Sequence, residues 1–449
     1  QYMEHYVEPS KTIPVMAKTD VLVIGSGPAG LSAALASARA GASTMLVERY
    51  GCFGGNITLA MVGTISWYRR EHTIDAGGIG VEFEMRAKKM GASHKDPEGD
   101  GEMLDTDMFK YVADVLIEEA GIIPLLHCMV TDVIMEGDTI TGVITESKSG
   151  RQAIMAKQFI DATGDADLAF KTGAPFRKEP KESMMGTTTS FGCSGVDVDA
   201  FLSYVKGNPS TLGDWALETT GKEDDMFSTF ISEPFEKATA AGEIPAGTPI
   251  IGYWDTLTDA GEAMNIDVAH VLNIDATDVR DLTHAEIMGR QEAVWAVAAL
   301  KKYTPGFEKA RLRTFNSSVG IRESREIIGE YIITEDDVKS QARFKDSIGI
   351  FPEFLDAYGV VTMPTTGRYL QLPFRAILPL KVENLLVAGR CISADKIAFA
   401  ATRQMMCCCV SGQGAGVAAA VSVKQNVNCR LVDIKKVQKI LKEQQVRID

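Results

Sequence analysis

The chain has no Cys-x-x-Cys pair among its eight cysteines. Zinc ribbons, iron–sulfur proteins and dithiol relays depend on such closely spaced thiols, so the sequence predicts no metal site. Cys407 to Cys409 would point in different directions on a helix and are interpreted as small apolar packing residues rather than ligands. We expect reduced thiols, as is typical of a cytoplasmic protein.

Positive charge is scarce as well, because 46 Lys and Arg against 60 Asp and Glu leave a net charge of -14 at pH 7. Such a chain repels the phosphate backbone of nucleic acids and anionic lipid surfaces. Residues 1–20 also lack the apolar core of a signal peptide. These absences indicate no nucleic-acid partner and favour a cytoplasmic location.

One stretch, Gln404–Val423, lacks charge altogether and is long enough to cross a bilayer. Its middle contains Gly412, Gly414 and Gly416 together with Ser and Gln, which make it polar and flexible. We therefore expect a buried helix packed closely on another element, and no membrane span.

The length of 449 residues exceeds what one hydrophobic core usually serves, which predicts two domains. With 45% hydrophobic and 24% charged residues, the composition is that of an ordinary globular protein. The interior is therefore large enough to hold a bulky cofactor.

The most informative segment lies near the start of the chain. Asp20–Ile24 is a short apolar run suited to a buried strand, and it leads directly into Gly25-Ser-Gly-Pro-Ala-Gly30. A helix is predicted over residues 31–40, followed by a second buried strand at Thr44–Val47 that closes at Glu48. The order strand, glycine turn, helix, strand and acidic residue is a complete β-α-β unit.

Each position in this unit suits a dinucleotide. Gly25 permits a tight turn, Gly27 lets the backbone approach a pyrophosphate, and Gly30 lets helix and strand pack closely. The helix N-terminus supplies N–H donors to the phosphates. Glu48 follows at the spacing expected of the acid that holds the ribose hydroxyls. The motif predicts a dinucleotide site but leaves the identity of the dinucleotide open.

Two later strands also run into glycine turns, one at Thr163-Gly164 and one at Gly389. With these motifs, the chain from about Asp20 to Val423 resembles the FAD-dependent oxidoreductases related to the flavoproteins of fumarate reductase and succinate dehydrogenase. The segments that carry the resemblance are Glu48–Gly55, Asp161–Leu168, Gly320–Glu330 and Asn384–Ser393.

The resemblance implies an α/β fold, with a Rossmann-like doubly wound FAD-binding domain and an inserted α+β substrate or cap domain. The short apolar runs, turns and amphipathic helices between about Gly173 and Ile350 agree with such an insertion. The expected division is a first FAD-binding part at 15–172, the substrate or cap region at 173–350, a second FAD-binding part at 351–425 and a C-terminal helix or tail at 426–449.

The resemblance also implies which residues surround FAD. Gly54-Gly55-Asn56 would lie beside the isoalloxazine, and Thr163 and Gly164 would flank the adenosine. Where many flavoproteins place an acidic residue after the glycine corresponding to Gly389, this chain has Arg390. A helix starting at Gly412–Gly416 would aim its positive end at the flavin. The predicted FAD-binding residues are Gly25, Gly27, Pro28, Ala29, Gly30, Glu48, Arg49, Gly54, Gly55, Asn56, Thr163, Gly164, Gly389, Arg390, Gly414 and Gly416.

Arg322 and Arg325 are the first candidates for catalysis. They would share a face if the segment were helical, although a strand start is also compatible with the sequence. Either they contact the flavin or a substrate, or they pair with carboxylates such as Glu323 and Glu326.

His270 is the second candidate, in a stretch that suggests a strand. Regular alternation would place Asp267 on the opposite face, so no carboxylate is expected beside the imidazole. A satisfied or solvent-facing histidine and an acid–base residue both remain open.

Arg403 is the third candidate. Many relatives carry a histidine shortly after the segment Arg390–Ser393, but this chain has none there. Asp395, Lys396 and Arg403 are the local polar alternatives, and each is equally compatible with a surface charge.

The expected activity is hydride transfer between flavin N5 and a small organic substrate. It would either reduce an activated double bond, which the three arginines slightly favour, or oxidise a C–OH or C–N bond. The alternative is a flavin-binding electron-transfer subunit of a larger complex. The electron donor or acceptor and the oligomeric state stay open.

Overall fold

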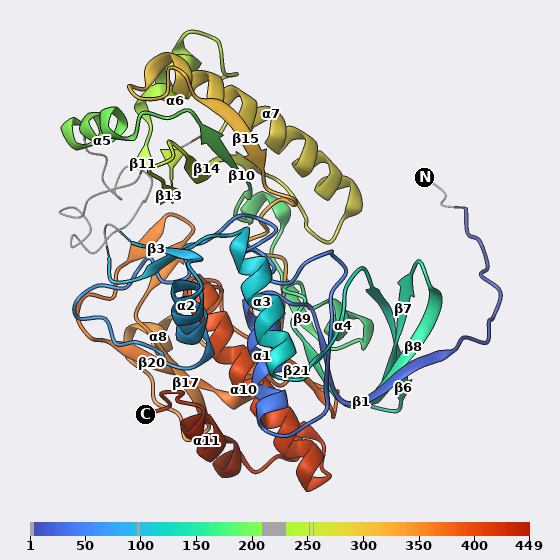
Figure 1. Ribbon diagram of the computed structural model, residues 1–449. Coiled ribbons are helices and arrows are strands. Elements are labelled where there is room, and N and C mark those ends of the chain that lie inside the picture. The colour runs from blue at the N-terminus through green and yellow to red at the C-terminus, as the bar shows by residue number, and fades with distance from the viewer. Residues whose placement is uncertain (1–3, 97–98, 209–229, 251, 255) are drawn as a thin grey trace.

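The computed structural model describes residues 4–96, 99–208, 230–250, 252–254 and 256–449. Its main sheet has the order β5-β2-β1-β8-β7-β6, and β21 also pairs with β8 (Figure 1). β1, β2, β5, β8 and β21 run parallel, whereas β6 and β7 continue the sheet antiparallel. These strands span Val15–Ile24 (β1), Thr44–Val47 (β2), Ile123–Leu125 (β5), Met129–Glu136 (β6), Thr139–Ser147 (β7), Gly150–Asp161 (β8) and Leu385–Val387 (β21).

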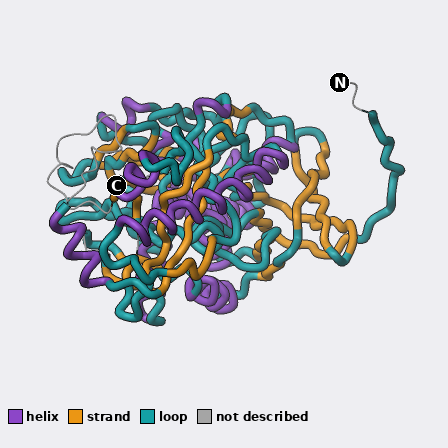
Figure 2. Tube along the Cα trace, turned by 90° about the horizontal axis from the view of Figure 1, so that it is seen from above, coloured by secondary structure: helices purple, strands orange, loops and turns teal. Residues whose placement is uncertain are grey.

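The parallel centre of this sheet explains the apolar run at its first strand. Val21, Leu22 and Val23 are fully buried, because helices or other strands cover both faces. α1 (Pro28–Arg39) follows β1 directly, so the predicted β-α-β unit and the Rossmann-like fold are confirmed. The segment before β1 runs away from the body of the molecule beside β6 and β7 (Figures 1 and 2).

α10 (Met405–Gln425) lies against α1 in the centre of the molecule. It is the one described helix that is long and apolar enough to cross a membrane, and 94% of its apolar 18-residue stretch is buried inside the protein. A Cβ on Gly412 would lie 2.2 Å from the carbonyl oxygen of Ala29, and one on Gly416 would lie 2.2 Å from that of Ala33. The predicted close packing is therefore correct, but the predicted helix start at Gly412–Gly416 is wrong, because the glycines lie inside the helix.

The remaining elements of this larger part cover the sheet or connect its strands. The helices are α2 (Ile79–Lys89), α3 (Met108–Glu119), α4 (Asp167–Lys171), α8 (Glu335–Lys339), α9 (Phe399–Thr402), α11 (Ile434–Glu443), and the 3-10 turns η1 (Lys181–Ser183), η3 (Phe374–Ile377) and η4 (Cys429–Leu431). The strands are β3 (Ser93–Lys95), β4 (Glu102–Leu104), β9 (Phe176–Lys178), β16 (Arg325–Ile327), β17 (Ser347–Pro352), β18 (Leu355–Ala357), β19 (Val360–Thr362) and β20 (Tyr369–Pro373).

A second sheet of order β13-β14-β10-β15 forms the cap together with the described helices α5, α6 and α7 (Figure 1). The cap has its own hydrophobic core, which includes Phe201. The ring centre of Phe201 lies 5.0 Å from the ring centres of Trp254 and Phe307. The core of the cap lies within the predicted insertion. Ile327 and Ile348, near the end of that predicted insertion, pack in the main core instead. The cap elements are β10 (Thr187–Ser194), α5 (Val198–Gly207), β11 (Phe230–Ile231), α6 (Glu233–Ala240), β12 (Gly252–Tyr253), β13 (Thr256–Leu257), β14 (Ala263–Val271), α7 (Val279–Tyr303) and β15 (Arg311–Phe315).

α7 packs across the cap sheet and carries a buried carboxyl group. Asp278 caps the helix by accepting hydrogen bonds from the N–H groups of Arg280 at 2.7 Å and Asp281 at 3.3 Å. Glu292 is 3% exposed, and its Oε2 has no hydrogen-bond partner among the described residues. Burial raises the pKa of Glu292 to about 7. The protonated form of this side chain is therefore the one that suits the fold.

Glu292→Gln should change how stability depends on pH. The folded chain binds more protons at this position than the unfolded chain between the ordinary glutamate pKa of 4.5 and about pH 7. Wild-type stability should therefore fall relative to the variant as pH rises through this window, by about 2–3 kcal/mol. Chemical denaturation at pH 5, 6.5 and 8 measures this, with exposed Glu118→Gln as the control. A difference that does not vary with pH would contradict the assignment.

Candidate functional site

The turn between β1 and α1 can be made only by glycine at two positions. Gly25 has φ +90°, and a Cβ there would lie 2.3 Å from the carbonyl oxygen of Ala162. A Cβ on Gly30 would lie 1.8 Å from the carbonyl oxygen of Gly25. The turn therefore brings the N-terminus of α1 against the ends of β1 and β8, where a ligand meets the helix N–H groups.

A second glycine segment lies against this turn. A Cβ on Gly55 would lie 2.5 Å from Cα of Gly27, so two backbones touch without side chains between them. The N–H of Gly54 donates to the carbonyl oxygen of Ser26 at 2.8 Å. Asn56 follows directly and donates through Nδ2 to the carbonyl oxygen of Ile321 at 3.1 Å. Bare backbone beside a helix N-terminus fits an extended pyrophosphate.

Glu48 lies at the end of β2 beside the same turn. Its Oε1 accepts hydrogen bonds from the hydroxyl of Ser26 at 2.6 Å and from the N–H of Ser26 at 3.2 Å. Its Oε2 accepts from the N–H of Tyr50 at 3.2 Å, and the side chain is buried. The neighbouring Arg49 is exposed and lies over the ring of Tyr50 at 4.7 Å. The carboxylate is placed where the predicted ribose contact requires it.

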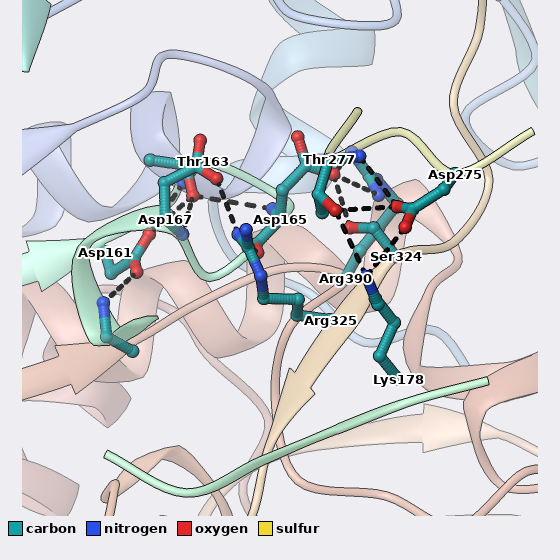
Figure 3. A network of polar contacts seen from close by, with 11 residues as sticks. Asp161, Thr163, Asp165, Asp167, Lys178, Asp275, Thr277, Ser324, Arg325 and Arg390 are labelled. Atoms are coloured by element: carbon teal, nitrogen blue, oxygen red, sulfur yellow. Dashed lines mark hydrogen bonds and ion pairs between the residues drawn. The ribbon is translucent and has the colours of Figure 1, made fainter. Parts of the chain in front are cut away.

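The carboxyl end of β8 is fixed by an internal carboxylate (Figure 3). Asp161 accepts hydrogen bonds through Oδ1 from the hydroxyl of Thr163 at 2.7 Å and through Oδ2 from the N–H of Ala169 at 2.9 Å. Burial raises the pKa of Asp161, although these hydrogen bonds oppose the rise. The turn at Thr163-Gly164 is therefore held rigidly next to the glycine turn of β1.

Arg390 joins the ends of β8 and β21. Its Nη1 and Nη2 each lie 3.2 Å from Oδ1 of Asp165, and a Cβ on Gly164 would lie 2.5 Å from Nη2. A Cβ on Gly389 would in turn lie 3.0 Å from Cβ of Ala29 in the first turn of α1. The structure thus brings the predicted residues at both strand ends to one place. The arginine that replaces the usual acid is paired with an aspartate in the turn that follows the neighbouring strand, β8.

Arg325 belongs to the same network. Its Nη1 donates to Oδ1 of Asp167 at 2.9 Å and to the carbonyl oxygen of Asp165 at 3.1 Å, and its guanidinium lies 4.2 Å from the ring centre of Phe170 (Figure 3). Burial and the nearby charges of Asp165 and Asp161 raise the pKa of Asp167 to about 6. Arg325 starts β16, so the helical face that it would have shared with Arg322 does not form.

A β-bulge places a carboxylate beside His270. In the pairing of β10 with β14, Thr189 faces Ala269 but Ser190 faces Asp267, so Val268 is an extra residue. Asp267 and His270 therefore share a face, and the prediction that they lie on opposite faces is wrong. His270 Nε2 lies 3.2 Å from Asp267 Oδ1, an ion-pair distance without an aligned hydrogen bond.

Arg322 binds the other oxygen of this carboxylate. Its Nη2 lies 3.2 Å from Asp267 Oδ2, and its Nη1 donates to the carbonyl oxygen of Gly186 at 2.9 Å and to the hydroxyl of Thr188. Burial would raise the pKa of Asp267, but the charge of Arg322 and the contact with His270 outweigh it and lower the pKa to about 2. Asp267 is therefore ionised throughout the neutral pH range.

A second arginine–aspartate pair lies within electrostatic reach of the first. Arg403 Nε donates to the carbonyl oxygen of Asp356 at 3.1 Å, and its Nη2 lies 3.4 Å from Asp356 Oδ2. Burial raises the pKa of Asp356, against which the charges of Arg403 and Arg322 both act. The hydroxyl of Tyr358 donates to Oε2 of Glu323. We name the whole group the arginine–carboxylate cluster: Asp267, His270, Arg322, Glu323, Asp356, Tyr358 and Arg403.

The arginine–carboxylate cluster contains polar atoms that the protein leaves unsatisfied. Among the described residues, Asp267 Oδ1 and Glu323 Oε1 are buried without a hydrogen-bond partner. Buried polar atoms of this kind are uncommon in proteins and are usually satisfied by water or a ligand. The cluster therefore has hydrogen-bonding capacity for a polar molecule.

The cluster lies next to the loop that carries Gly54-Gly55-Asn56. The N–H groups of Ser317 and Ser318 donate to the carbonyl oxygen of Leu59 at 2.8 and 3.1 Å, and a Cβ on Gly320 would lie 3.4 Å from Cβ of Ala60. Ile321, bound by Asn56, directly precedes Arg322. The structure thus brings His270, Arg322 and Arg403 together beside the predicted flavin loop.

Some predicted residues lie elsewhere, and others were missed. Gly414 packs on Ile348 and Gly416 on Ala33, so the reason for expecting them at the flavin no longer holds. Asp267 was assigned to the wrong face, since the bulge depends on the partner strand. Asp356 follows no recognisable motif. Within the described ranges, no group of three or more His, Cys, Asp or Glu is placed to hold a metal ion.

Three parallel strands, β1, β8 and β21, end in glycine turns, and the acidic Glu48 follows β2. This arrangement defines an α/β dinucleotide-binding enzyme. The chain matches the family model "FAD dependent oxidoreductase" over residues 20–441 and belongs to that family. It is an FAD-dependent oxidoreductase, and FAD is its cofactor. The glycine-lined turn and Glu48 fit this group, since both lie where FAD needs bare backbone and a ribose acceptor.

Curated relatives match only part of the chain. A thiamine thiazole synthase from Methanococcus vannielii is 30% identical over 166 residues, which cover 33% of this chain and 57% of the relative. A 4-oxocyclohex-2-ene-1-carboxylate 5-dehydrogenase from Sinomonas cyclohexanicum is 35% identical over 119 residues, covering 25% and 19%. The chain thus matches little more than half the length of the first relative.

Solved structures are similar over most of the chain at low identity. A geranylgeranyl bacteriochlorophyll reductase-like protein from Thermoplasma acidophilum has a TM-score of 0.47 and 14% identity, covering 96% of this chain and 85% of that one. A flavin-dependent brominase has a TM-score of 0.46 and 13% identity, covering 95% and 83%.

Glu48→Ala should weaken FAD retention without unfolding the protein. The variant loses the ribose acceptor and the acceptor that holds Ser26, which corresponds to about 1–3 kcal/mol. FAD titration of the flavin-free protein should show a Kd raised roughly 5- to 150-fold. The exposed Glu136→Ala, with a similar change in charge, should bind FAD normally. Normal FAD affinity in Glu48→Ala would contradict the assignment.

Proposed function

We propose that the protein transfers a hydride between FAD and a small polar organic substrate bound at the arginine–carboxylate cluster. The observation that carries this is the cluster itself, in which Asp267 and His270 of the cap meet residues of the main part beside Gly54-Gly55-Asn56, with unsatisfied buried polar atoms. FAD, when bound, supplies the hydride chemistry. The side chains of the cluster bind and orient the substrate and exchange its proton.

His270 is proposed as the residue that moves the proton. Its Nε2 faces Asp267, so Nδ1 is the nitrogen left for a substrate. Asp267 is the positioning residue, and Arg322 keeps its carboxylate ionised through Oδ2. A contact that is loose in the absence of substrate and aligns when substrate binds is common for such pairs.

The two arginines of the cluster are proposed to orient oxygen atoms of the substrate. Both are paired with aspartates, so they add hydrogen-bond donors without a large excess of positive charge. Arg325 is proposed to have a structural role, since it pairs with Asp167 at the start of α4. Both reduction of an activated double bond and oxidation of a C–OH or C–N bond are compatible with this arrangement.

Three further features complete the proposal. We propose that the enzyme acts in the cytoplasm, because its cysteines are all unpaired and seven of the eight are buried thiols. We also propose a closer relationship to the flavoproteins of fumarate reductase and succinate dehydrogenase, on the motifs described above. A small unsaturated carboxylate is a reasonable first substrate, since one relative is named for a cyclic enone carboxylate.

His270→Gln should slow the flavin reaction by about 10²- to 10⁴-fold, the usual contribution of a general acid or base. Reduced enzyme is reoxidised anaerobically by unsaturated acids, including 4-oxocyclohex-2-ene-1-carboxylate, and oxidised enzyme is tested with alcohols and amines for bleaching. FAD content should stay normal, and His284→Gln at the exposed start of α7 should react like wild type. If no compound reacts with the wild type, the proposed hydride transfer is wrong. If His270→Gln reacts as fast as the wild type, only the proposed role of His270 is wrong.

Arg322→Lys and Arg325→Lys should separate the two arginine sites. Lysine keeps the charge but loses the planar fork, so Arg322→Lys should lower kcat/KM at least about tenfold for a good substrate. Arg325→Lys should lower the melting temperature more than Arg322→Lys does, and it should lower kcat/KM less than Arg322→Lys does. Activities are compared per bound FAD, with a melting curve for each variant. Equal kinetic losses in both variants would argue against a substrate contact specific to Arg322.

A further inference from the structure

A cavity of about 480 Å³ lies outside the proposed substrate site, in the larger part of the molecule. Three segments line it: the loop between α8 and β17, the turn η3 with the residue that follows it, and the segment around η4. Its size is within the range of about 300–1,000 Å³ that is typical of small-molecule sites. The lining residues are Arg343, Phe344, Lys345, Asp346, Phe374, Arg375, Leu378, Arg430 and Val432.

The floor of this cavity is apolar and well fixed. Phe374 and Leu378 are buried, and Phe344 and Val432 are half-buried. The ring of Phe344 packs edge-on against Tyr331 at 5.1 Å, which holds the floor in place. Most of the apolar surface that a flat group could lie against is therefore offered by Phe344 and Val432.

Two of the four cations at the rim are already neutralised. Arg375 donates through Nε and Nη2 to Asp346 at 3.0 and 3.3 Å. Arg430 pairs with Glu330 and also donates to the carbonyl oxygen of Val382 at 2.9 Å. Their guanidinium groups shape the rim but add little net charge.

The other two rim cations are not neutralised. Arg343 donates to three carbonyl oxygens and lies 4.0 Å from the ring centre of Tyr369. Lys345 is exposed. Among the described residues, neither side chain has a carboxylate within ion-pair distance. Two uncompensated positive charges therefore lie two residues apart at the rim of an apolar cavity.

The surroundings strengthen this positive charge in a protein that is otherwise acidic. The last 26 residues carry seven Lys and Arg against three Asp and Glu, although the whole chain has a net charge of -14. α11 contributes the exposed Lys435, Lys436 and Lys439, and its Gln438 Nε2 donates to the carbonyl oxygen of Lys345 at 2.9 Å. This lysine-bearing helix thus contacts the backbone of one residue that lines the cavity.

We propose that the cavity binds a small organic anion with a flat apolar ring. The ring lies against Phe344 and Val432, the more exposed apolar residues of the lining, and a carboxylate or phosphate group pairs with Arg343 and Lys345. An apolar floor alone would select neutral hydrophobic molecules, and a cationic rim alone would bind any anion. The combination requires both parts in one ligand. This site goes beyond the proposed hydride transfer, since none of its residues belongs to the arginine–carboxylate cluster.

Calorimetric titration of the FAD-loaded protein tests the ligand class. The probes are phenyl phosphate, benzoate, inorganic phosphate and benzyl alcohol. Phenyl phosphate or benzoate should bind with one site per chain and at least tenfold more tightly than inorganic phosphate or benzyl alcohol, and the tighter of the two identifies the anionic group. Absence of binding by both aromatic anions, or equally tight binding of inorganic phosphate, overturns the proposal.

Matched charge reversals locate the site. Lys345→Glu should weaken binding of the better aromatic anion at least tenfold, whereas Lys436→Glu on α11 should change it less than twofold. Both lysines are exposed, so both variants should keep the FAD content and melting temperature of the wild type. An equal loss of affinity in the two variants overturns the cavity site. It would indicate instead a diffuse basic surface of the kind that binds an acidic partner protein.

A third variant distinguishes this cavity from the substrate site. Arg322→Lys should leave the affinity for the aromatic anion unchanged, because Arg322 belongs to the arginine–carboxylate cluster. A loss in Arg322→Lys without a loss in Lys345→Glu would place the probe at the cluster and overturn the inference. That result would leave the proposed hydride transfer intact.

Discussion

The close contact between α1 and α10 determines where everything else at the centre can lie. Bare glycine backbone of α10 meets the carbonyl oxygens of Ala29 and Ala33, and no larger residue fits at either contact. Ser411 of α10 also accepts a hydrogen bond from the N–H of Gly389 at 3.0 Å. One helix near the end of the chain therefore positions the first turn of α1 and the end of β21. The glycine turn between β1 and α1 depends on packing made by residues almost four hundred positions away.

Charge in the site is arranged as pairs rather than as excess. Arg390 faces Asp165, Arg325 faces Asp167, Arg322 faces Asp267 and Arg403 faces Asp356. Because a buried lone charge costs several kcal/mol, each guanidinium needs its carboxylate in order to be buried at all. The pairs also connect different chain segments, so they hold strand ends and cap together. Selectivity for a substrate would then come from geometry and hydrogen bonding more than from net charge.

The sequence predicted what depends on neighbouring residues and failed where distant strands decide. The β-α-β unit, Gly25 and Glu48 were predictable because turn, helix and acid lie at fixed local spacings. The position of Asp267 was not, since a bulge arises only when β14 pairs with β10. Arg322 and Arg325 are three positions apart, so they would have shared a face had the segment been helical. The two side chains lie at different sites because β16 begins at Arg325, so no helix joins the two residues.

The extra residue at Val268 has a consequence for how this enzyme can change. Inserting one residue into β10 between Thr189 and Ser190 would give Val268 a partner, restore regular alternation along β14 and turn Asp267 toward α7, where the carboxyl of Glu292 already lies buried. Replacing Val268 with another apolar residue would leave the pairing of His270 and Asp267 untouched. The local chemistry is therefore encoded in the length of a strand rather than in the identity of a side chain. An insertion in β10, a strand that carries neither Asp267 nor His270, could therefore alter reactivity while every site residue is retained.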